Sequence, residues 1–228
     1  MGPSWRTLLT GPPDLSYGGS RCSTASTTFF PLRPAGSRPA IGAAAACGYR
    51  DLVARQFQLV RTTVRPRPAI PGQGILDPSV LHLRVRPADL DVYLHVNNGV
   101  YLQMMDVARS AYIADLGGFP LLKKKRWYPV VAAQTVSYRR SLTLGQRFTI
   151  TTRVVGWDPR VIYLEQLFTR GDELCARGLV AGRFLTHGSG ARVPATDVAS
   201  LLAPGVPSPP LPADVDQWAR AIDVAHRG

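Results

Sequence analysis

The hydrophobic pattern changes its period along the chain. Between residues 99 and 116, apolar side chains recur every three or four positions: Val100, Met104, Val107, Ala111 and Leu116. This spacing predicts a long helix with one buried face. Asn97 or Asn98 suits its N-cap, because an Asn side chain accepts hydrogen bonds from the first free N–H groups. Gly117 and Gly118 predict its end.

Five other segments are rich in β-branched and aromatic residues and predict strands: Pro78–Val85, Tyr128–Tyr138, Arg147–Val155, Val161–Thr169 and Leu174–Thr186. Short turns separate the last four, so we expect these to form an antiparallel meander. The helix must bury its apolar face on that sheet. The pattern therefore predicts an α+β fold, in which an antiparallel sheet of about five strands wraps around one central helix.

Proline and glycine, 41 residues together, gather towards the two ends of the 228-residue chain. Residues 1–48 lack apolar periodicity and are expected to be disordered, as a transit-type targeting segment or as upstream sequence from a wrongly chosen start codon. The Pro-rich stretch 203–212 predicts a linker to a helix over 212–225, anchored by Trp218. The chain thus divides into a leader (1–48), a basic extension (49–76), a central domain (77–187) and a C-terminal region (188–228).

The net charge of +12 does not predict a nucleic-acid partner. Residues 1–75 carry nine Arg and two Asp, so over half of the excess lies ahead of the central domain. No helix-turn-helix, zinc-finger or RNA-binding motif is present. Within residues 49–65, apolar and Arg residues alternate at helical spacing. This predicts a basic amphipathic helix that either contacts a membrane surface or caps the domain.

The three cysteines, Cys22, Cys47 and Cys175, are scattered and show no metal-binding spacing. Cys175 lies in a strand-like segment and is expected to be a small buried residue. No run of 18 apolar residues predicts a transmembrane helix. A reducing, cytoplasmic location and no metal are therefore expected.

The loop before the helix carries the candidate chemistry. It reads DLDVYLHVNNGVY from Asp89 to Tyr101, continues into MMDVAR, and is followed by SYRRSLTLG at residues 137–145. In this order the motifs resemble the 4-hydroxybenzoyl-CoA thioesterase family, whose loop reads roughly D-x-D-x-x-G-H-V-N-N-x-x-Y. The resemblance covers about residues 77–187. It implies a hot-dog fold, an acyl-CoA thioesterase activity, no further cofactor, and a homodimer or higher homo-oligomer with sites at the subunit interface.

By this resemblance, Asp91 occupies the position of the catalytic carboxylate. A carboxylate can take a proton from water or attack the thioester itself. N–H groups at a helix N-terminus can then stabilise the oxyanion. His95, Asn97, Asn98 and Tyr101 are expected to hold the loop or position the substrate.

Other charged residues leave alternatives open. Asp89 and Asp106 are secondary candidates for the catalytic acid. Asp106 has Arg109 three residues later, which equally predicts an ion pair on the helix surface. The run Lys123–Arg126 could bind the phosphates of coenzyme A or could simply be solvated, and so could Arg139 and Arg140.

Leu94 stands where the family usually has glycine. Glycine adopts positive φ at little cost, whereas leucine disfavours it. We therefore expect a loop that runs differently, a narrower pocket or reduced activity. This departure keeps a second hypothesis open, a non-catalytic protein that binds acyl-CoA or an acyl lipid. A hot-dog dehydratase is disfavoured, because its catalytic His loop is not found.

Overall fold

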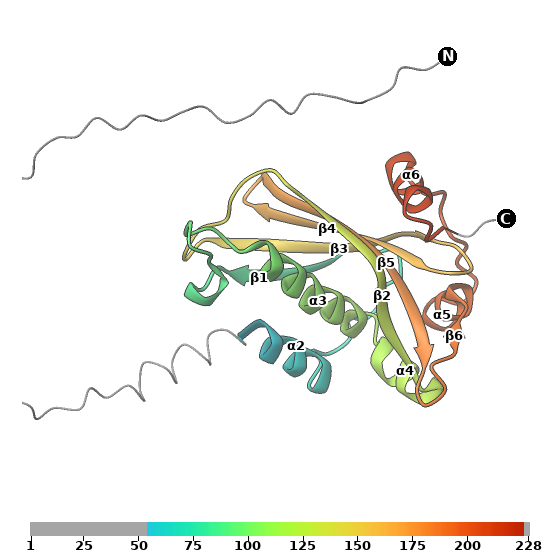
Figure 1. Cartoon of the computed structure of the whole chain (residues 1–228). Helices are drawn as coiled ribbons and strands as arrows, with labels where there is room; N and C mark the ends of the chain where they lie inside the picture. Colours follow the sequence, from blue (N-terminus) through green and yellow to red (C-terminus); the bar gives the residue numbers. More distant parts are fainter. Residues whose placement is uncertain (1–53, 226–228) are drawn as a thin grey trace, which may run out of the picture. The chain divides into compact units, whose positions relative to one another are not determined.

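The computed structural model of the protein describes residues 54–225 (Figure 1). Its elements are α2 (Ala54–Val64), β1 (Ser79–Arg84), the 3-10 turn η1 (Pro87–Asp89), α3 (Asn98–Asp115), α4 (Gly118–Lys125), β2 (Trp127–Tyr138), β3 (Arg147–Trp157), β4 (Ile162–Arg170), β5 (Glu173–Thr186), β6 (Arg192–Val193), α5 (Ala195–Leu202) and α6 (Ala213–Ala221). An antiparallel sheet lies around α3, so the predicted α+β arrangement and the main strands are confirmed. The leader 1–48, with Cys22 and Cys47, lies outside the described residues.

The strand order β1-β3-β4-β5-β2 shows that one part of the predicted meander is wrong. β3, β4 and β5 are antiparallel neighbours, as expected, but β2 pairs with β5 and β3 pairs with β1. Residues 139–146 cross the end of the sheet instead of forming a hairpin turn. The Val96 N–H donates to the Leu142 carbonyl at 2.9 Å. Leu142 is fully buried there, which a turn at the surface would not allow.

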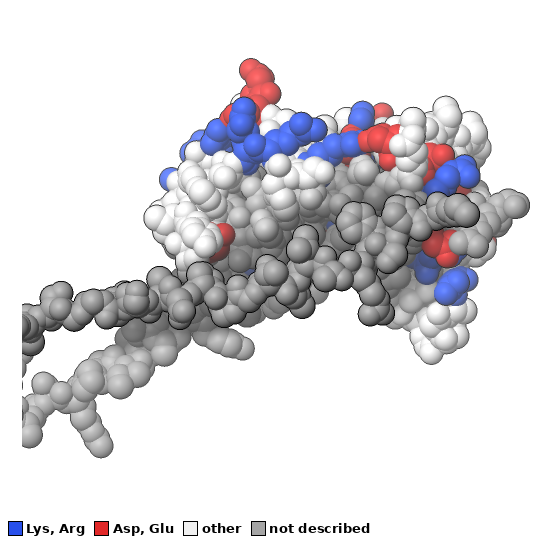
Figure 2. All heavy atoms as spheres, turned by 45° about the horizontal axis from the view of Figure 1, so that its top comes forward, with Lys and Arg blue, Asp and Glu red and all other residues white. Residues whose placement is uncertain are grey.

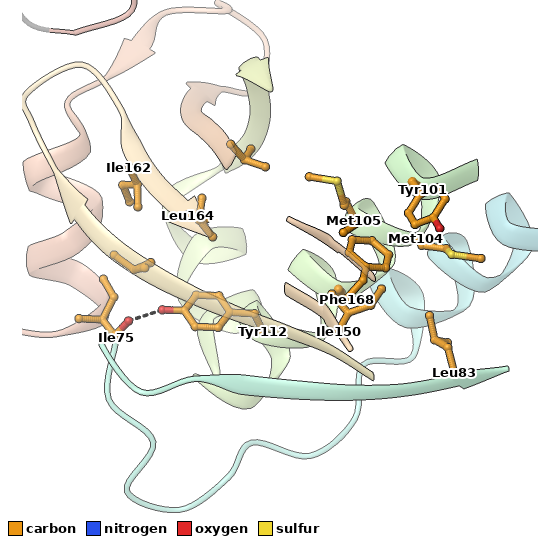
Figure 3. Close-up of a cluster of buried hydrophobic side chains, with 14 of the residues drawn as sticks. Ile75, Leu83, Tyr101, Met104, Met105, Tyr112, Ile150, Ile162, Leu164 and Phe168 are labelled. Carbon is orange, nitrogen blue, oxygen red and sulfur yellow. Dashed lines mark hydrogen bonds between the residues drawn. The ribbon is translucent and has the colours of Figure 1, made fainter. Parts of the chain in front are cut away.

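Helix α3 supplies one side of the main core. Met104, Met105, Ala108 and Tyr112 pack with Phe168 and other side chains from the concave face of the sheet (Figure 3). Room for Met105 comes from Gly178 on β5, where an added Cβ would lie only 2.4 Å from the Met105 Cε atom. Burying large side chains of this kind stabilises each by about 1.5–3 kcal/mol.

Helix α2 packs on α3, and its buried Arg55 binds the loop that follows β1. The Arg55 guanidinium donates to both Asp89 carboxylate oxygens, at 2.8 and 2.6 Å, and to the Arg84 carbonyl at 3.0 Å. The part of the predicted amphipathic helix that the structure describes therefore caps the domain. Phe57 and Val60 of this helix are exposed. Residues 49–53 lie outside the described residues.

The region after residue 187 contains more structure than a linker and one helix. β6 extends the sheet beside β5, and Val193, Val198 and Ala199 belong to the same core as α3. Helix α6 covers the outer face of the sheet, where Trp218 packs as an anchor. The Ser208 hydroxyl accepts from the Trp157 N–H at 2.8 Å and so fastens the Pro-rich stretch to β3.

Two helices, α4 and α5, were not anticipated from the sequence. Glycines mark the start of α4, since Gly117 is its N-cap with φ 64°. Across residues 54–225, no helix is both long enough and apolar enough to span a bilayer. Cys175 is buried on β5, as predicted.

Candidate functional site

Asp91 sits in a tight loop that ends at the N-terminus of α3. Its N–H donates to the His95 carbonyl at 2.8 Å, and its carbonyl accepts from the Leu94 N–H at 3.1 Å. The Asp91 Oδ1 atom accepts from the N–H groups of Tyr93, at 2.9 Å, and His95, at 3.3 Å. Within the described chain, Oδ2 accepts no hydrogen bond. One carboxylate oxygen therefore orients the side chain while the other remains available for chemistry.

Leu94 adopts the left-handed conformation, with φ 60°. The hydrogen bonds of the Asp91 turn hold leucine in a conformation that glycine adopts at little cost. The expected difference from the family's loop stays a prediction. The Leu94 side chain is 68% exposed, so it does not narrow the pocket at Asp91. The departure from the family motif lies at the surface of the loop.

Asp91 lines a pocket of about 290 Å³. It combines the loop before α3, the first turn of that helix, and the segment that follows β2. Its lining comprises Asp91, His95, Val96, Asn98, Tyr101, Tyr138, Arg139, Arg140 and Ser141. The structure thus brings four of the predicted site residues, Asp91, His95, Asn98 and Tyr101, to one place.

The N-terminus of α3 opens on this pocket. Asn97 is the N-cap, as predicted, and its Oδ1 atom accepts from the Gly99 N–H at 2.8 Å. The Asn98 N–H has no acceptor among residues 54–225, and the first N–H groups of a helix favour negative charge. The Tyr138 hydroxyl donates to the Asn98 carbonyl at 3.4 Å, a long contact. The helix end therefore offers a donor for an oxyanion.

Tyr101 forms an inner wall of the pocket. Its ring meets Tyr138 at 5.0 Å between centroids and Phe168 at 5.1 Å. Burial, with a smaller contribution from Cys175, raises the pKa of Tyr101 to about 12. The ring, packed against Tyr138 and Phe168, forms an apolar wall of the site.

The structure separates the two secondary carboxylates from Asp91. Asp89 is buried, and both its oxygens are taken up by Arg55 and by the Arg86 N–H. Asp106 forms an ion pair with Arg109 on α3 and is 41% exposed. Arg109 also donates to Gln166 at 2.8 Å, and burial lowers its pKa. Neither acid lines the pocket of Asp91.

A second, larger cavity of about 330 Å³ was not anticipated from the sequence. It is mainly apolar and lies beside the C-terminal half of α3. Its walls include Ile75, Tyr112, Ile162 and Leu164, which face one another in Figure 3, with Asp106 and Arg109 at the helix. These residues come from elements far apart in sequence, so no local pattern could reveal the cavity.

The basic residues considered for binding the phosphates of coenzyme A lie at the two ends of β2. Arg139 and Arg140 line the Asp91 pocket, and Arg140 pairs with Glu173 at 3.1 Å. Lys123–Arg126 close α4 at the far end of β2, about 36 Å away at about 3.3 Å per residue. Figure 2 shows basic side chains in a broken band across the domain. Tyr138 and Ser141 also line the pocket, which the sequence did not indicate.

Known proteins are similar to this chain over most of the domain. Zebrafish (Danio rerio) Protein THEM6 is 33% identical over 158 residues, which cover 69% of this chain and 76% of that protein. The Long-chain acyl-CoA thioesterase FadM of Escherichia coli is 31% identical over 87 residues, 38% of this chain and 66% of FadM. The crystal structure of the YbaW probable thioesterase from Escherichia coli has a TM-score of 0.51 at 23% identity and covers 54% of this chain and 94% of that one.

The likeness to YbaW supports the fold, and the predicted hot-dog architecture is confirmed. The sequence model of the thioesterase-like superfamily matches residues 85–219, from the end of β1 to α6. This range includes the Asp91 loop, the central helix and the whole β2–β5 sheet. The chain belongs to the thioesterase-like superfamily.

Proposed function

We propose that the protein hydrolyses acyl-CoA thioesters to a free acid and coenzyme A, with Asp91 as the catalytic carboxylate. The arrangement of Asp91 carries this proposal. Its side chain is oriented through one oxygen, its other oxygen faces no internal donor in the described structure, and an unpaired helix N–H lies on the same pocket. The likeness to FadM supports acyl-CoA as the substrate class.

Two routes use the same atoms. As a general base, Asp91 removes a proton from water while the water oxygen attacks the thioester carbonyl carbon. As a nucleophile, Asp91 forms an acyl anhydride that water then hydrolyses. On either route the C–S bond breaks, and the sulfur leaves as a thiolate that takes up a proton. The Asn98 N–H is the proposed donor to the oxyanion, aided by the positive end of α3.

The apolar cavity is the proposed site for the acyl chain, and a second copy of the chain would bring it to Asp91. Within one chain, Asn98 and Arg109 are separated by about 16 Å along α3, so the cavity and Asp91 lie apart. One edge of β2 pairs with no strand of the described chain, and an unpaired edge is a template for another strand. Symmetric antiparallel pairing would set residues 127–131 of the second copy opposite residues 134–138. In the second copy, Pro129 and Val131 line the apolar cavity of that copy. The pairing would bring them near Asp91 of the first copy.

The decisive test is thiol release by the full chain from acyl-CoAs of different length, with Asp91→Asn beside the wild type. We expect Asp91→Asn to lower kcat/KM by about 100-fold or more, the range in which positioned acid–base groups contribute. Asp172→Asn, in the exposed turn between β4 and β5, makes the same chemical change and should retain activity. A fully active and folded Asp91→Asn protein would overturn the assignment.

The same assay separates hydrolysis from the alternative of a non-catalytic acyl-CoA or acyl-lipid binding protein. That alternative rests on Leu94. Because the loop keeps its left-handed turn, we favour hydrolysis. Tight binding of acyl-CoA without thiol release, by a protein of unchanged thermal stability, would instead favour the binding protein.

A further inference from the structure

Three arginines surround a small hollow on the outer face of the sheet. Arg160 lies in the turn between β3 and β4, Arg183 on β5, and Arg192 on β6. They line a hollow of about 140 Å³ together with Pro159, Val193 and Pro194. This volume exceeds the roughly 10–15 Å³ that one water needs and is below the roughly 300 Å³ at which small-molecule sites begin. The hollow therefore fits one anionic group.

The folding of the sheet brings these side chains together. The turn holding Arg160 is fixed by Asp158, whose Oδ1 atom accepts from the N–H groups of Arg160 and Val161 at 2.7 and 2.9 Å. In the β5–β6 ladder, Leu185 pairs with Arg192, so Arg192 and Arg183 share the outer face. The positions are thus set by backbone hydrogen bonds on rigid elements.

The cluster holds more positive than negative charge. Between residues 54 and 225, neither Arg183 nor Arg192 forms an ion pair or a side-chain hydrogen bond. Burial, followed by the neighbouring Arg192 and Arg160, lowers the pKa of Arg183, and Asp158 opposes this effect only in part. Arg160 donates one N–H to the Ala225 carbonyl at 2.8 Å, which is not a charged acceptor. Like charges held at a hollow are unfavourable unless an anion joins them.

We propose that Arg160, Arg183 and Arg192 form a binding site for a phosphate group, distinct from the Asp91 pocket. Three guanidinium groups match a phosphate, which carries a charge of about −1.5 to −2 and several acceptor oxygens, better than a single carboxylate. The site is far from Asp91 of the same chain. Arg183 lies eight residues along β5 from Cys175, whose carbonyl accepts from Arg139 at that pocket, or about 26 Å. The phosphate is either a free anion or a group of a larger molecule such as coenzyme A.

Thermal unfolding of the full chain tests the site without any assay of hydrolysis. We expect inorganic phosphate, compared with chloride at the same ionic strength, to raise Tm by roughly 3–5 °C at ten times Kd. In Arg183→Gln/Arg192→Gln, phosphate should bind at least tenfold more weakly. Arg65→Gln removes the same charge from an exposed position remote from the cluster and should respond like the wild type.

The sign of the effect without phosphate distinguishes a binding site from a structural role. Because the substitutions relieve like-charge repulsion, the double variant should have a Tm at or above that of the wild type in chloride. The single variant Arg192→Gln, at an exposed position, repeats the test with little risk to folding. Equal phosphate responses in the wild type and both variants would overturn the proposal, as would a wild type that phosphate does not stabilise.

Two further arms identify the source of the phosphate. One result would assign the site to the 3′-phosphate of coenzyme A. In that case coenzyme A stabilises the wild type but not the double variant, and 3′-dephospho-coenzyme A stabilises the wild type less than coenzyme A does. Stabilisation by inorganic phosphate, with no effect of the double substitution on coenzyme A binding, would assign it to a free anion. Either result supports the site, and both are independent of whether Asp91 is catalytic.

Discussion

At the scale of single residues, Leu94 shows how a loop can keep its conformation against local preference. A left-handed conformation costs a residue with a Cβ atom about 1–2 kcal/mol. Here it is held by the hydrogen bonds between Asp91 and His95 and by the pairing of Val96 with Leu142. The conformation of the turn is therefore determined by the surrounding structure and not by the type of residue at position 94.

Substitutions at Leu94 test this conformation. We expect Leu94→Gly to be at least as stable as the wild type, because relief of the left-handed strain offsets the backbone entropy of glycine. Leu94→Val should be less stable than Leu94→Gly by about 1–2 kcal/mol, since β-branched residues tolerate positive φ poorly. Urea unfolding of the three proteins measures the order. Equal stability of the Gly and Val variants would show that the turn is not left-handed.

At the scale of elements, α2 is joined to the domain by its packing on α3 and by a buried ion pair. Both side chains of the Arg55–Asp89 pair are almost fully buried, whereas the Arg220–Asp216 pair on α6 is exposed. Removing one partner of a buried pair leaves an uncompensated charge. The two pairs have the same chemistry and differ chiefly in solvent access.

We expect Arg55→Met to lower the free energy of unfolding by about 3–5 kcal/mol. The matched change Arg220→Met should have a far smaller effect on the free energy of unfolding, since exposed pairs contribute little. Chemical denaturation gives both values. Similar small losses for the two variants would mean that α2 is not held through Arg55.

The outward face of α2 bears on the predicted membrane contact. Phe57, Val60 and Val64 are exposed at helical spacing beside Arg61 and Arg65. If this face contacts lipid, the chain should sediment with vesicles containing phosphatidylglycerol more than with vesicles of phosphatidylcholine alone. Phe57→Ser/Val60→Ser should reduce that binding several-fold, whereas Gln56→Ser/Thr63→Ser, on the same exposed side, should not. Equal binding by the two double variants would argue against membrane contact through α2.

At the scale of the whole molecule, the two edges of the sheet differ. β1 ends one edge with six residues, and β2 ends the other with twelve, of which Val131 and Thr135 are exposed. A long edge strand rich in apolar residues favours pairing with a second copy. The proposed dimer therefore uses β2.

Lysine on an edge strand opposes such pairing. We expect Val131→Lys/Thr135→Lys to halve the molecular mass in analytical ultracentrifugation, because the charged side chains would keep the two β2 edges apart. Val80→Lys, at an exposed position of the β1 edge, should leave the mass unchanged. A dimeric Val131→Lys/Thr135→Lys protein would exclude β2 as the interface.

By itself, the sequence determined the elements whose signals are local. The period of the apolar residues placed α3 and the main strands to within a few residues, and the motif around Asp91 named four residues of its pocket. These features depend on neighbours within a few positions, so they can be read along the chain. The family followed from the same motifs.

Tertiary structure decided everything that depends on distant partners. β2 joined β5 instead of β3 because the segment 139–146 crosses to the loop of Asp91, where Leu142 is buried and its carbonyl accepts from the Val96 N–H, a contact that no turn pattern reveals. Asp89 became a structural partner of Arg55, which lies 34 residues earlier. The apolar cavity and the three-arginine hollow also draw on separate elements. Burial and charge at such places are properties of the packed chain, since they arise only when segments far apart in sequence meet.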